Sequence, residues 1–225
     1  MEINLRKEFL DKQCSHWEES FNNNSEMFGT NSSLPAQKAV EIFKEKGVKK
    51  VLELGGGQGR DTIYFAQNGL QVDVLEYTYI GVETIKKKSK ELGLSQLINP
   101  IQHDVRTPFP FDDDSFDAIY SHMLYCMAFT TKELEFITKE SRRVLKPEGF
   151  NTYTVRNTDD EHFGQGIHRG EDMYEVGGFI VHFFSQEKVK SLAKGFDIVQ
   201  IDNFEEGGLP RKLYQVILKN HIKLG

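Results

Sequence analysis

Apolar residues follow two alternating patterns along the chain. Short runs that are mostly apolar, or that alternate apolar and polar positions, predict β-strands, and longer segments with apolar residues every three or four positions predict amphipathic helices. The expected strands cover residues 51–54, 70–75, 98–102, 115–121 and 150–155, and the expected helices contain residues 36–43, 63–66, 82–92 and 134–145. Because strands alternate with helices, the chain is expected to form an α/β fold, a parallel sheet with helices on both faces.

Two further strands are expected near the end of the chain, at Phe196–Ile201 and Leu213–Leu218, after a helix at Val189–Ala193. The connection between these strands contains Gly207-Gly208 and Pro210 and is too short for a helical crossover. They are therefore expected to pair antiparallel. The predicted sheet has five parallel strands and a C-terminal antiparallel hairpin.

Two segments lie outside this alternation. Residues 1–34 are polar, with asparagine and serine clusters, and are expected to form a helical leader or lid to a core domain of residues 35–225. Residues 157–184 separate the fifth strand from the next helix and contain glycines at 164, 166, 170, 177 and 178. Connections of this length often form lids or binding loops, so this insert is expected on the substrate side of the domain.

The first strand runs into the most informative motif, Val51-Leu-Glu-Leu-Gly-Gly-Gly-Gln-Gly-Arg-Asp61. Glycines in this position allow a ligand to approach the backbone closely, and the helix that follows presents unpaired N–H groups. The second strand ends at Glu76, about 20 residues beyond the glycines, where a carboxylate can accept both hydroxyls of a ribose. The third strand ends next to Asp104. These features together predict a nucleotide-cofactor site.

In the order of its motifs, the chain resembles the class I S-adenosylmethionine (SAM)-dependent methyltransferases. The G-x-G-x-G spacing behind Glu53, the acids Glu76 and Asp104, and the segments 110–119 and 143–149 carry the resemblance, which covers about residues 35–220. It implies the five-plus-two sheet and SAM as the cofactor. The cofactor residues are then expected to be Glu53, Gly55, Gly56, Gly57, Gly59, Arg60, Glu76, Tyr77, Asp104, Val105, Ser121 and His122.

The resemblance gives several of these residues a role. Glu76 would hold the ribose, and Asp104 the adenine amino group, with the Val105 amide on a ring nitrogen and Tyr77 beside the ring. Arg60 can pair with the cofactor carboxylate, and an exposed structural arginine is an equal alternative. Aromatic residues of the leader, Trp17, Phe21 and Phe28, either close over the cofactor or simply pack on the core.

His122 and Tyr125 are the catalytic candidates, because they follow the fourth strand where methyl transfer would occur. Histidine is a common general base, so His122 can deprotonate an acceptor. The alternative is that it only contacts the cofactor, since an acceptor that is ionised at neutral pH needs no base. Tyr125 can equally be a core aromatic residue.

Candidate substrate residues are Arg156, His162 and His182, which lie in or beside the insert. The histidines of this segment have no H-x-x-x-H spacing and no cysteine pair to fix a metal geometry, so no metal site is expected.

Charge and cysteine content narrow the function. The 225 residues carry a formal net charge of −6, which gives no general attraction to a polyanion, so nucleic acid is not expected as a partner. Cys14 and Cys126 are far apart in the sequence and fit a reducing compartment. No apolar stretch is long enough to span a membrane, and the expected location is the cytoplasm.

The predicted function is methyl transfer from SAM to a small-molecule acceptor. Residues 121–124 do not form the N-P-P-Y-like tetrapeptide of enzymes that methylate nitrogens of nucleic acids and proteins, and the chain is loosely similar to the thiopurine and tellurite-resistance methyltransferases. One alternative is an NAD-dependent oxidoreductase. Arg60 argues against it, because a dinucleotide-binding motif has its third glycine at this position. Another is a noncatalytic SAM-binding module.

Overall fold

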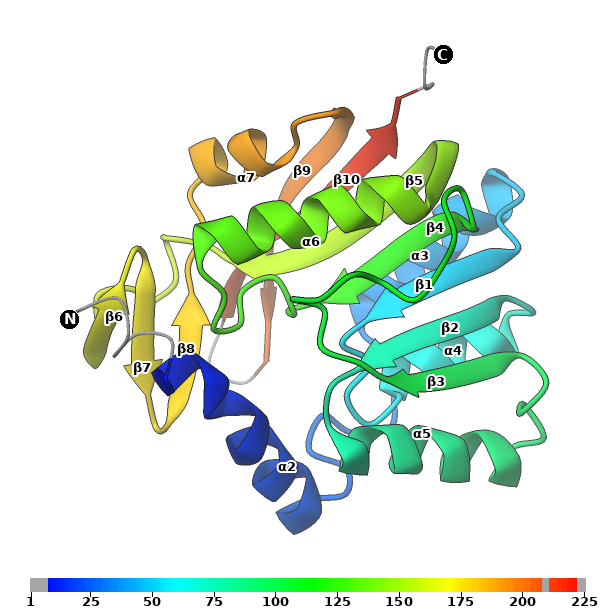
Figure 1. Cartoon of the computed structure of the whole chain (residues 1–225), viewed down its shortest axis with the longest axis horizontal. Helices are drawn as coiled ribbons and strands as arrows, with labels where there is room; N and C mark the ends of the chain where they lie inside the picture. Colours follow the sequence, from blue (N-terminus) through cyan, green and yellow to red (C-terminus); the bar gives the residue numbers. More distant parts are fainter. Residues whose placement is uncertain (1–7, 208–210, 222–225) are drawn as a thin grey trace.

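A seven-stranded sheet forms the centre of the computed structural model, which describes residues 8–207 and 211–221. The strand order is β3-β2-β1-β4-β5-β10-β9, with β1 to β5 parallel and β10 antiparallel to both of its neighbours (Figure 1). The strands are β1 (Lys50–Leu54), β2 (Gln71–Glu76), β3 (Ile98–Gln102), β4 (Phe116–His122), β5 (Leu145–Arg156), β9 (Phe196–Glu206) and β10 (Arg211–Asn220). The prediction of five parallel strands and an antiparallel hairpin is confirmed.

Helices cover both faces of this sheet, and each face has its own hydrophobic core (Figure 1). The helices are α3 (Leu34–Glu45), α4 (Arg60–Gln67) and α5 (Tyr79–Glu91) on one face, and α6 (Thr131–Val144) and α7 (Gln186–Leu192) on the other. Along β1 the side chains alternate between the cores, so Val51 packs toward α3 and Leu52 toward α6. The apolar periodicity of these helices therefore arises from burial against the sheet.

The start of β5 differs from its predicted position. The sequence pattern assigns Leu145 to the preceding helix and begins the strand at Phe150, whereas β5 begins at Leu145. Leu145 is the register partner of Phe116, and an irregularity in the β4–β5 pairing between Phe116 and Ala118 accommodates the residues in between. The side chain of Leu145 is thus buried in the core between the sheet and α6, as it would be if the residue belonged to the helix.

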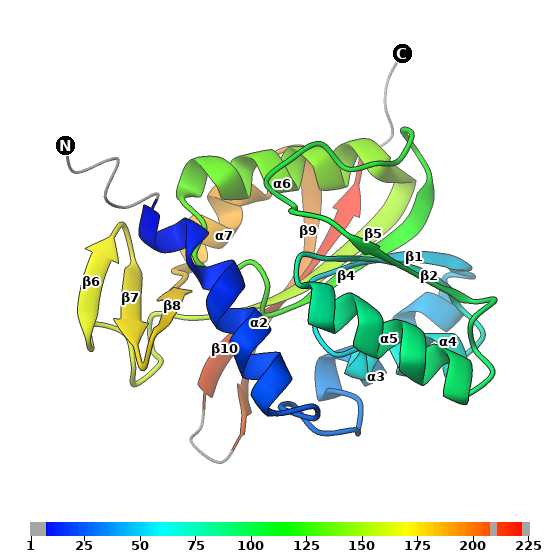
Figure 2. The ribbon, with the colours of Figure 1, turned by 60° about the horizontal axis from the view of Figure 1, so that its bottom comes forward.

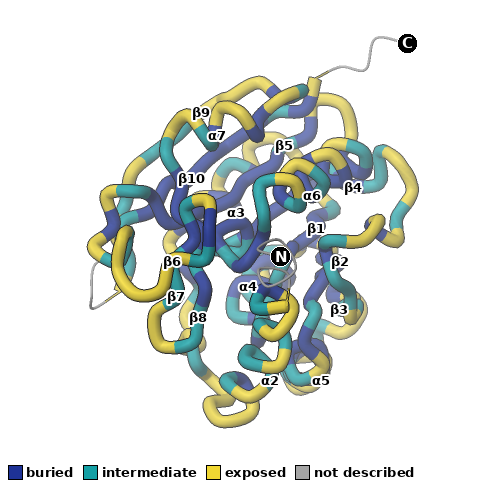
Figure 3. The backbone as a smooth tube through the Cα atoms, turned by 60° about the vertical axis from the view of Figure 1, so that its left-hand side comes forward, coloured by how far each residue is buried: buried dark blue, intermediate teal, exposed yellow. Residues whose placement is uncertain are grey.

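The insert of residues 157–184 forms a second, three-stranded antiparallel sheet, which the sequence pattern did not predict. Its strands are β6 (Ile167–Gly170), β7 (Met173–Val176) and β8 (Phe179–His182). This small sheet stands beside the carboxyl end of β5, apart from the main sheet (Figure 1). The outer strand β6 is largely exposed, while the central strands of the main sheet are buried (Figure 3).

The leader contains helix α2 (Gln13–Asn23), which lies between the small sheet and α5 (Figure 2). Both amide atoms of the Gln13 side chain bond to the backbone of the small sheet, to Gly178 O at 3.0 Å and from Ile180 N at 3.1 Å. In the middle of the helix, the Glu18 carboxylate accepts hydrogen bonds from Tyr79 N and Ile80 N at the start of α5. The leader therefore bridges the insert and the main domain.

Candidate active site

A cavity of about 580 Å³ lies where the carboxyl ends of β1, β2 and β4 face α2 and the small sheet. Its walls come from the glycine motif, from the ends of the parallel strands, from the leader and from the insert. Of the predicted site residues, it is lined by Glu53, Gly55, Gly56, Gly57, Arg60, Glu76, Tyr77, Asp104, Val105, His122, Arg156 and His162. The structure thus brings most of the sequence-predicted residues together.

The glycine motif forms one wall of the cavity, and three of its glycines have backbone angles that favour glycine. Gly55 has φ +72° and Gly57 has φ +55°. A Cβ at Gly55 would lie 2.9 Å from the side chain of Leu124, and one at Gly56 would lie 2.5 Å from Val74. The loop therefore has no room for side chains, and its backbone borders the cavity directly. Gly59 begins α4 with φ +85° but does not line the cavity.

Glu76 joins the end of β2 to the glycine loop. One carboxylate oxygen accepts from Gly57 N at 2.8 Å, and the other accepts from the backbone N and the hydroxyl of Thr78 at 2.9 and 2.7 Å. Burial raises the pKa of Glu76, and the hydrogen bonds from Thr78 and Gly57 oppose that rise. The carboxylate is thus held in one orientation at the position where the resemblance places a ribose.

Glu53 lies behind the loop at the end of β1, buried and hydrogen-bonded by the hydroxyl of Thr62. Burial and the charge of Asp61 raise the pKa of Glu53 to about 8. A carboxyl group with such a pKa is mostly protonated at neutral pH.

Asp104 is already paired with an arginine that sequence reasoning missed. Arg106 donates to both Asp104 oxygens, with Nε at 3.0 and 3.1 Å and Nη2 at 2.7 Å, and reaches Asp11 of the leader through Nη1 at 2.5 Å. Although burial opposes ionisation, the hydrogen bonds from Arg106 lower the pKa of Asp104. Tyr77 and Val105 complete this part of the wall.

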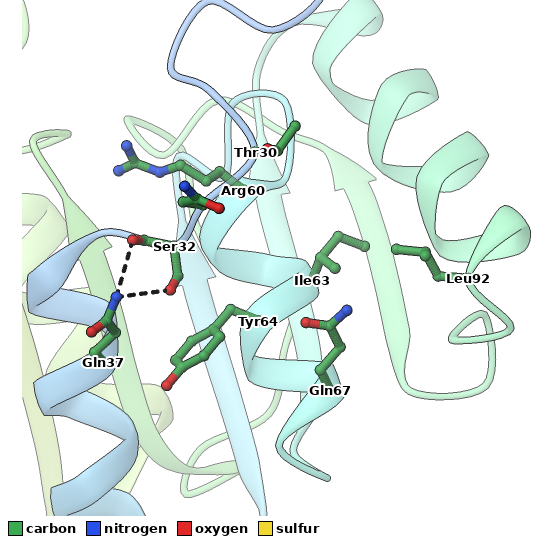
Figure 4. Close-up of a pocket in the computed structure, with 9 residues that line it drawn as sticks. Thr30, Ser32, Gln37, Arg60, Ile63, Tyr64, Gln67 and Leu92 are labelled. Atoms are coloured by element: carbon green, nitrogen blue, oxygen red, sulfur yellow. Dashed lines mark hydrogen bonds between the residues drawn. The ribbon is translucent and has the colours of Figure 1, made fainter.

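Arg60 lies at the edge of the cavity. Its guanidinium donates to Asp61 Oδ1 at 3.2 Å and to the carbonyl of Phe28 at 3.2 Å, so these groups already hold the side chain. On its other side a shallower hollow of about 490 Å³ lies between α3, α4 and the end of α5, lined by Gln37, Tyr64 and Leu92 among others (Figure 4). Arg60 therefore separates two surface depressions.

His122, at the end of β4, is held through both ring nitrogens. Nδ1 lies 2.9 Å from the Thr154 hydroxyl, and Nε2 lies 3.1 Å from a carboxylate oxygen of Glu206. The Thr154 oxygen already accepts from Met123 N at 3.0 Å, so its hydroxyl proton is free to be donated to Nδ1. The imidazole then carries its proton on Nε2 and donates it to Glu206. Burial opposes ionisation of Glu206, but the hydrogen bond from His122 and the nearby arginines hold its pKa below the ordinary value.

Arg156 and His162 lie together at the end of β5. Arg156 forms a bidentate ion pair with Asp160 through Nε and Nη2, and Nη2 also donates to His162 Nδ1 at 2.9 Å. The guanidinium carbon lies 5.2 Å from the centre of the Phe183 ring. All of these side chains except Asp160 line the cavity.

The aromatic residues of the leader do line the cavity. Trp17 packs against Phe21 at 5.5 Å and Phe28 at 6.2 Å between ring centres, and against Phe179 of the insert at 4.7 Å. They therefore pack on one another and on the insert while lining the cavity, and their closure over the cofactor stays a prediction.

Three predicted site residues point elsewhere. Tyr125 is 1% exposed, stacks on Tyr153 with ring centres 4.5 Å apart and lies in the α6 core. Ser121 is fully buried and does not line the cavity. His182 is also fully buried, and its Nδ1 lies 2.7 Å from the carbonyl of Phe129. The structure thus places none of the three where it can touch a ligand in this cavity.

Sequence reasoning missed Glu206, the partner of His122. A signal existed in the topology, because β9 is antiparallel to β10 and β10 is antiparallel to β5. The end of β9 therefore falls at the same edge of the sheet as the carboxyl ends of the parallel strands. Within the described part of the chain, no three His, Cys, Asp or Glu side chains are grouped so that they could hold a metal ion.

Comparison with known proteins agrees with this geometry. Residues 51–149 match a family model described as a methyltransferase domain. The 24-methylenesterol C-methyltransferase 3 of Arabidopsis thaliana is 30% identical over 172 residues, which cover 72% of this chain and 45% of that protein. The chain thus spans less than half the length of this relative.

Solved structures share the fold at low sequence identity. A SAM-dependent methyltransferase from Methanosarcina mazei has a TM-score of 0.69 at 19% identity, covering 77% of this chain and 93% of that one. The 1,6-didemethyltoxoflavin-N1-methyltransferase of Burkholderia thailandensis, with 1,6-didemethyltoxoflavin and S-adenosylhomocysteine bound, has a TM-score of 0.67 at 16% identity, covering 97% of this chain and 88% of that one.

Residues 51–149 therefore form a methyltransferase domain, and the chain has the fold of the class I SAM-dependent methyltransferases, whose cofactor is SAM. The family model and these relatives are methyltransferases, so the oxidoreductase alternative finds no support among them.

None of the helices in residues 8–207 and 211–221 is long and apolar enough to cross a membrane.

Proposed function

We propose that this chain binds SAM and transfers its methyl group to a small, largely apolar acceptor. The observation that carries the proposal is that the glycine loop and Glu76 line the same cavity as an aromatic wall built by the leader and the insert. Its volume of about 580 Å³ is in the range of small-molecule sites. A cofactor region and an acceptor region in one space are what direct group transfer requires.

The residues present fit the cofactor. The side-chain-free loop at Gly55 and Gly57 lets the backbone approach the methionine part, Glu76 is positioned for the ribose hydroxyls, and Asp104 and Val105 border the adenine position. When bound, SAM supplies a methyl group on a positively charged sulfur. The rings of Trp17 and its aromatic neighbours can stabilise that charge.

The acceptor region is mainly apolar. Met127, Phe129, Phe179, Val181 and Phe183 contribute to its walls. The Arabidopsis relative is named as a methyltransferase of a sterol, which is also a largely apolar molecule. The net charge of −6 supports a small-molecule acceptor over nucleic acid. The free cysteines Cys14 and Cys126 support a reducing compartment such as the cytoplasm.

His122 and Glu206 are the proposed proton-handling pair. Thr154 fixes the imidazole from behind, and the Glu206 carboxylate is held in its ionised form. An acceptor that must lose a proton can pass it to this pair, and an acceptor that is already ionised needs only orientation. Variants His122→Asn and Glu206→Gln therefore distinguish these two kinds of acceptor.

The test is methyl transfer from labelled SAM by the purified full chain to a panel of thiols, phenols, amines, carboxylic acids and sterols. Glu76→Ala should weaken SAM binding by at least about tenfold, since a charged hydrogen bond contributes on the order of 1.5–3 kcal/mol. Glu91→Ala is the matched control, because Glu91 is an exposed glutamate at the far end of α5. SAM binding with no turnover of any acceptor would favour a noncatalytic SAM-binding module, and saturable NAD binding without SAM binding would contradict the proposal.

A further inference from the structure

The guanidinium of Arg156 is fixed by a carboxylate that is itself fully engaged. Asp160 accepts from Nε at 2.9 Å and from Nη2 of Arg156, and also from the backbone N of His162 and of Lys212, both at 2.9 Å. The Asp160 side chain is 1% exposed and that of Arg156 8%. Asp160 therefore acts as a rear anchor that sets the orientation of Arg156.

Two donors of this cluster remain without a protein partner. Nη1 of Arg156 has no hydrogen-bond partner among the described residues, although the side chain lines the cavity. Because a guanidinium can only donate, Nδ1 of His162 accepts from Nη2, and the imidazole carries its proton on Nε2. Nε2 likewise has no partner in the part of the chain that the structure describes. The cluster thus offers hydrogen-bond donors to a ligand.

These donors stand in an apolar surrounding. Arg156 lies over the Phe183 ring, and Tyr174, Phe179 and Val181 line the same cavity. A hydrogen bond from such an enclosed donor to a ligand oxygen is more stabilising than one from a donor in water, because the enclosed donor has few other acceptors. Arginine with one edge anchored is well suited to carboxylate and carbonyl oxygens.

The cluster is close to the proposed transfer site. Thr154 is the register partner of His122, and Arg156 follows it by two residues on the same face of β5. Two residues of a strand span about 7 Å. A small molecule can therefore reach from the Arg156 cluster to His122.

We propose that the methyl acceptor carries a carboxylate or carbonyl oxygen that binds to Arg156 and His162, while its apolar body packs on Phe179 and Phe183. The reacting atom then faces His122 and Glu206. This inference rests on the proposed function, because it assigns the acceptor class of the same cavity. It identifies Arg156 as a specificity-determining residue.

The test uses three probes with the same alkyl chain and different ends: decanoate, decan-2-one and decylamine. They are titrated, below their micelle concentrations, into full-length protein saturated with S-adenosylhomocysteine. Trp17 is the only tryptophan of the chain and lines the cavity, so its fluorescence reports binding. Decanoate or decan-2-one should bind at least about tenfold more tightly than decylamine. Tighter binding of decanoate indicates a carboxylate group, and tighter binding of decan-2-one a carbonyl.

Arg156→Lys keeps a positive charge beside Asp160 but removes the free Nη1. It should weaken binding of the preferred probe by about tenfold. His162→Phe tests the second donor and should have an effect in the same direction. The matched control is Arg169→Lys, since Arg169 also pairs with a carboxylate, Glu175, and stacks on an aromatic ring, but does not line the cavity.

Affinity for S-adenosylhomocysteine, measured by calorimetry, should be the same in all these proteins. That measurement separates failure of this inference from failure of the cofactor site. The inference is overturned if decylamine binds as tightly as the oxygen-bearing probes, if no probe binds, or if Arg156→Lys behaves like Arg169→Lys.

Discussion

Three glutamates border the cavity, and their surroundings give them different chemistry. Burial raises the pKa of Glu53 and Glu76, whereas for Glu206 the hydrogen bond from His122 and the nearby positive charges together outweigh burial and lower the pKa. Glu76 is held by three hydrogen bonds and is suited to fixed recognition, and Glu206 is suited to carry negative charge. Glu53 is the one whose protonation state should change within the ordinary pH range of experiments.

Glu53 should make stability depend on pH. The folded-state pKa is about 8, while the ordinary value is 4.5, so between these values the folded chain holds a proton that the unfolded chain has lost. The contribution of Glu53 to the free energy of unfolding should therefore fall as pH rises from about 4.5 to about 8, in total by on the order of a few kcal/mol, since one pKa unit corresponds to about 1.4 kcal/mol. Glu53→Gln cannot ionise and should remove most of this fall.

Urea unfolding of both proteins at about pH 5 and about pH 8 checks this expectation. Glu91→Gln, at an exposed position on α5, is the control and should retain the wild-type pH dependence. An equally steep fall in Glu53→Gln would mean that another group causes it.

At the residue scale, the sequence predicted the acids at the ends of β2 and β3 but not the direction of every side chain at the end of β4 and beyond it. Glu76 is the last residue of β2 and Asp104 lies two residues beyond β3, so their place at the sheet edge follows from the strand assignment alone. Tyr125 follows Met123, whose φ of +61° turns the chain. The turn directs Tyr125 into the core beside Tyr153, and no periodic pattern reveals a single left-handed residue.

At the scale of elements, three glutamine and glutamate side chains fix the leader over the site. Gln13 bonds to the small sheet, Glu18 to the start of α5, and Gln58 of the glycine motif to the leader, accepting from Met27 N and donating to Asn24 O. The strands and helices of the main sheet could be predicted because each buries a continuous apolar face. The strands of the insert are each four residues long, which is too short to show such a period.

The two histidines that the sequence grouped as substrate residues belong to different parts of the insert. His162 lines the cavity, while His182 is buried against Phe129 and close to Lys188. His182→Ala should therefore lower the free energy of unfolding by about 2 kcal/mol, through loss of a buried ring and its hydrogen bond. His162→Ala should leave stability nearly unchanged.

The same prediction has a pH signature. Burial and the charge of Lys188 lower the pKa of His182 below its ordinary 6.5, so the unfolded chain takes up a proton that the folded chain does not. His182 should then contribute a loss of stability as pH drops below about 6.5, opposite in sign to the contribution of Glu53, and His182→Gln should remove that contribution. The exposed His168 of the same sheet provides the control variant His168→Gln. An unchanged acid dependence in His182→Gln would contradict this structural role.

At the scale of the whole molecule, the cavity is assembled from segments that lie far apart in the sequence. The glycine loop, the leader, the insert and the end of β9 each supply a wall, so a bound cofactor contacts several elements at once. A ligand that binds only the folded state adds its binding free energy to the free energy of unfolding. Thermal unfolding of the full chain therefore measures which cofactor this assembly accepts.

SAM and S-adenosylhomocysteine should raise the Tm, and NAD should not. At a concentration of about 100 times the Kd, the added stability is about 2.7 kcal/mol, which corresponds to a rise of roughly 5–10 °C for a chain of this size. NAD is expected to fail because Arg60 stands where a dinucleotide loop needs its third glycine, and that arginine is held by Asp61 and the Phe28 carbonyl. Glu76→Ala should lose about half of the rise or more at the same ligand concentration, since a tenfold weaker affinity leaves about 1.4 kcal/mol, whereas Glu91→Ala should keep it. An equal rise with NAD and with SAM would contradict the assignment of the glycine loop, because both ligands would then have to be held by contacts that the loop does not select.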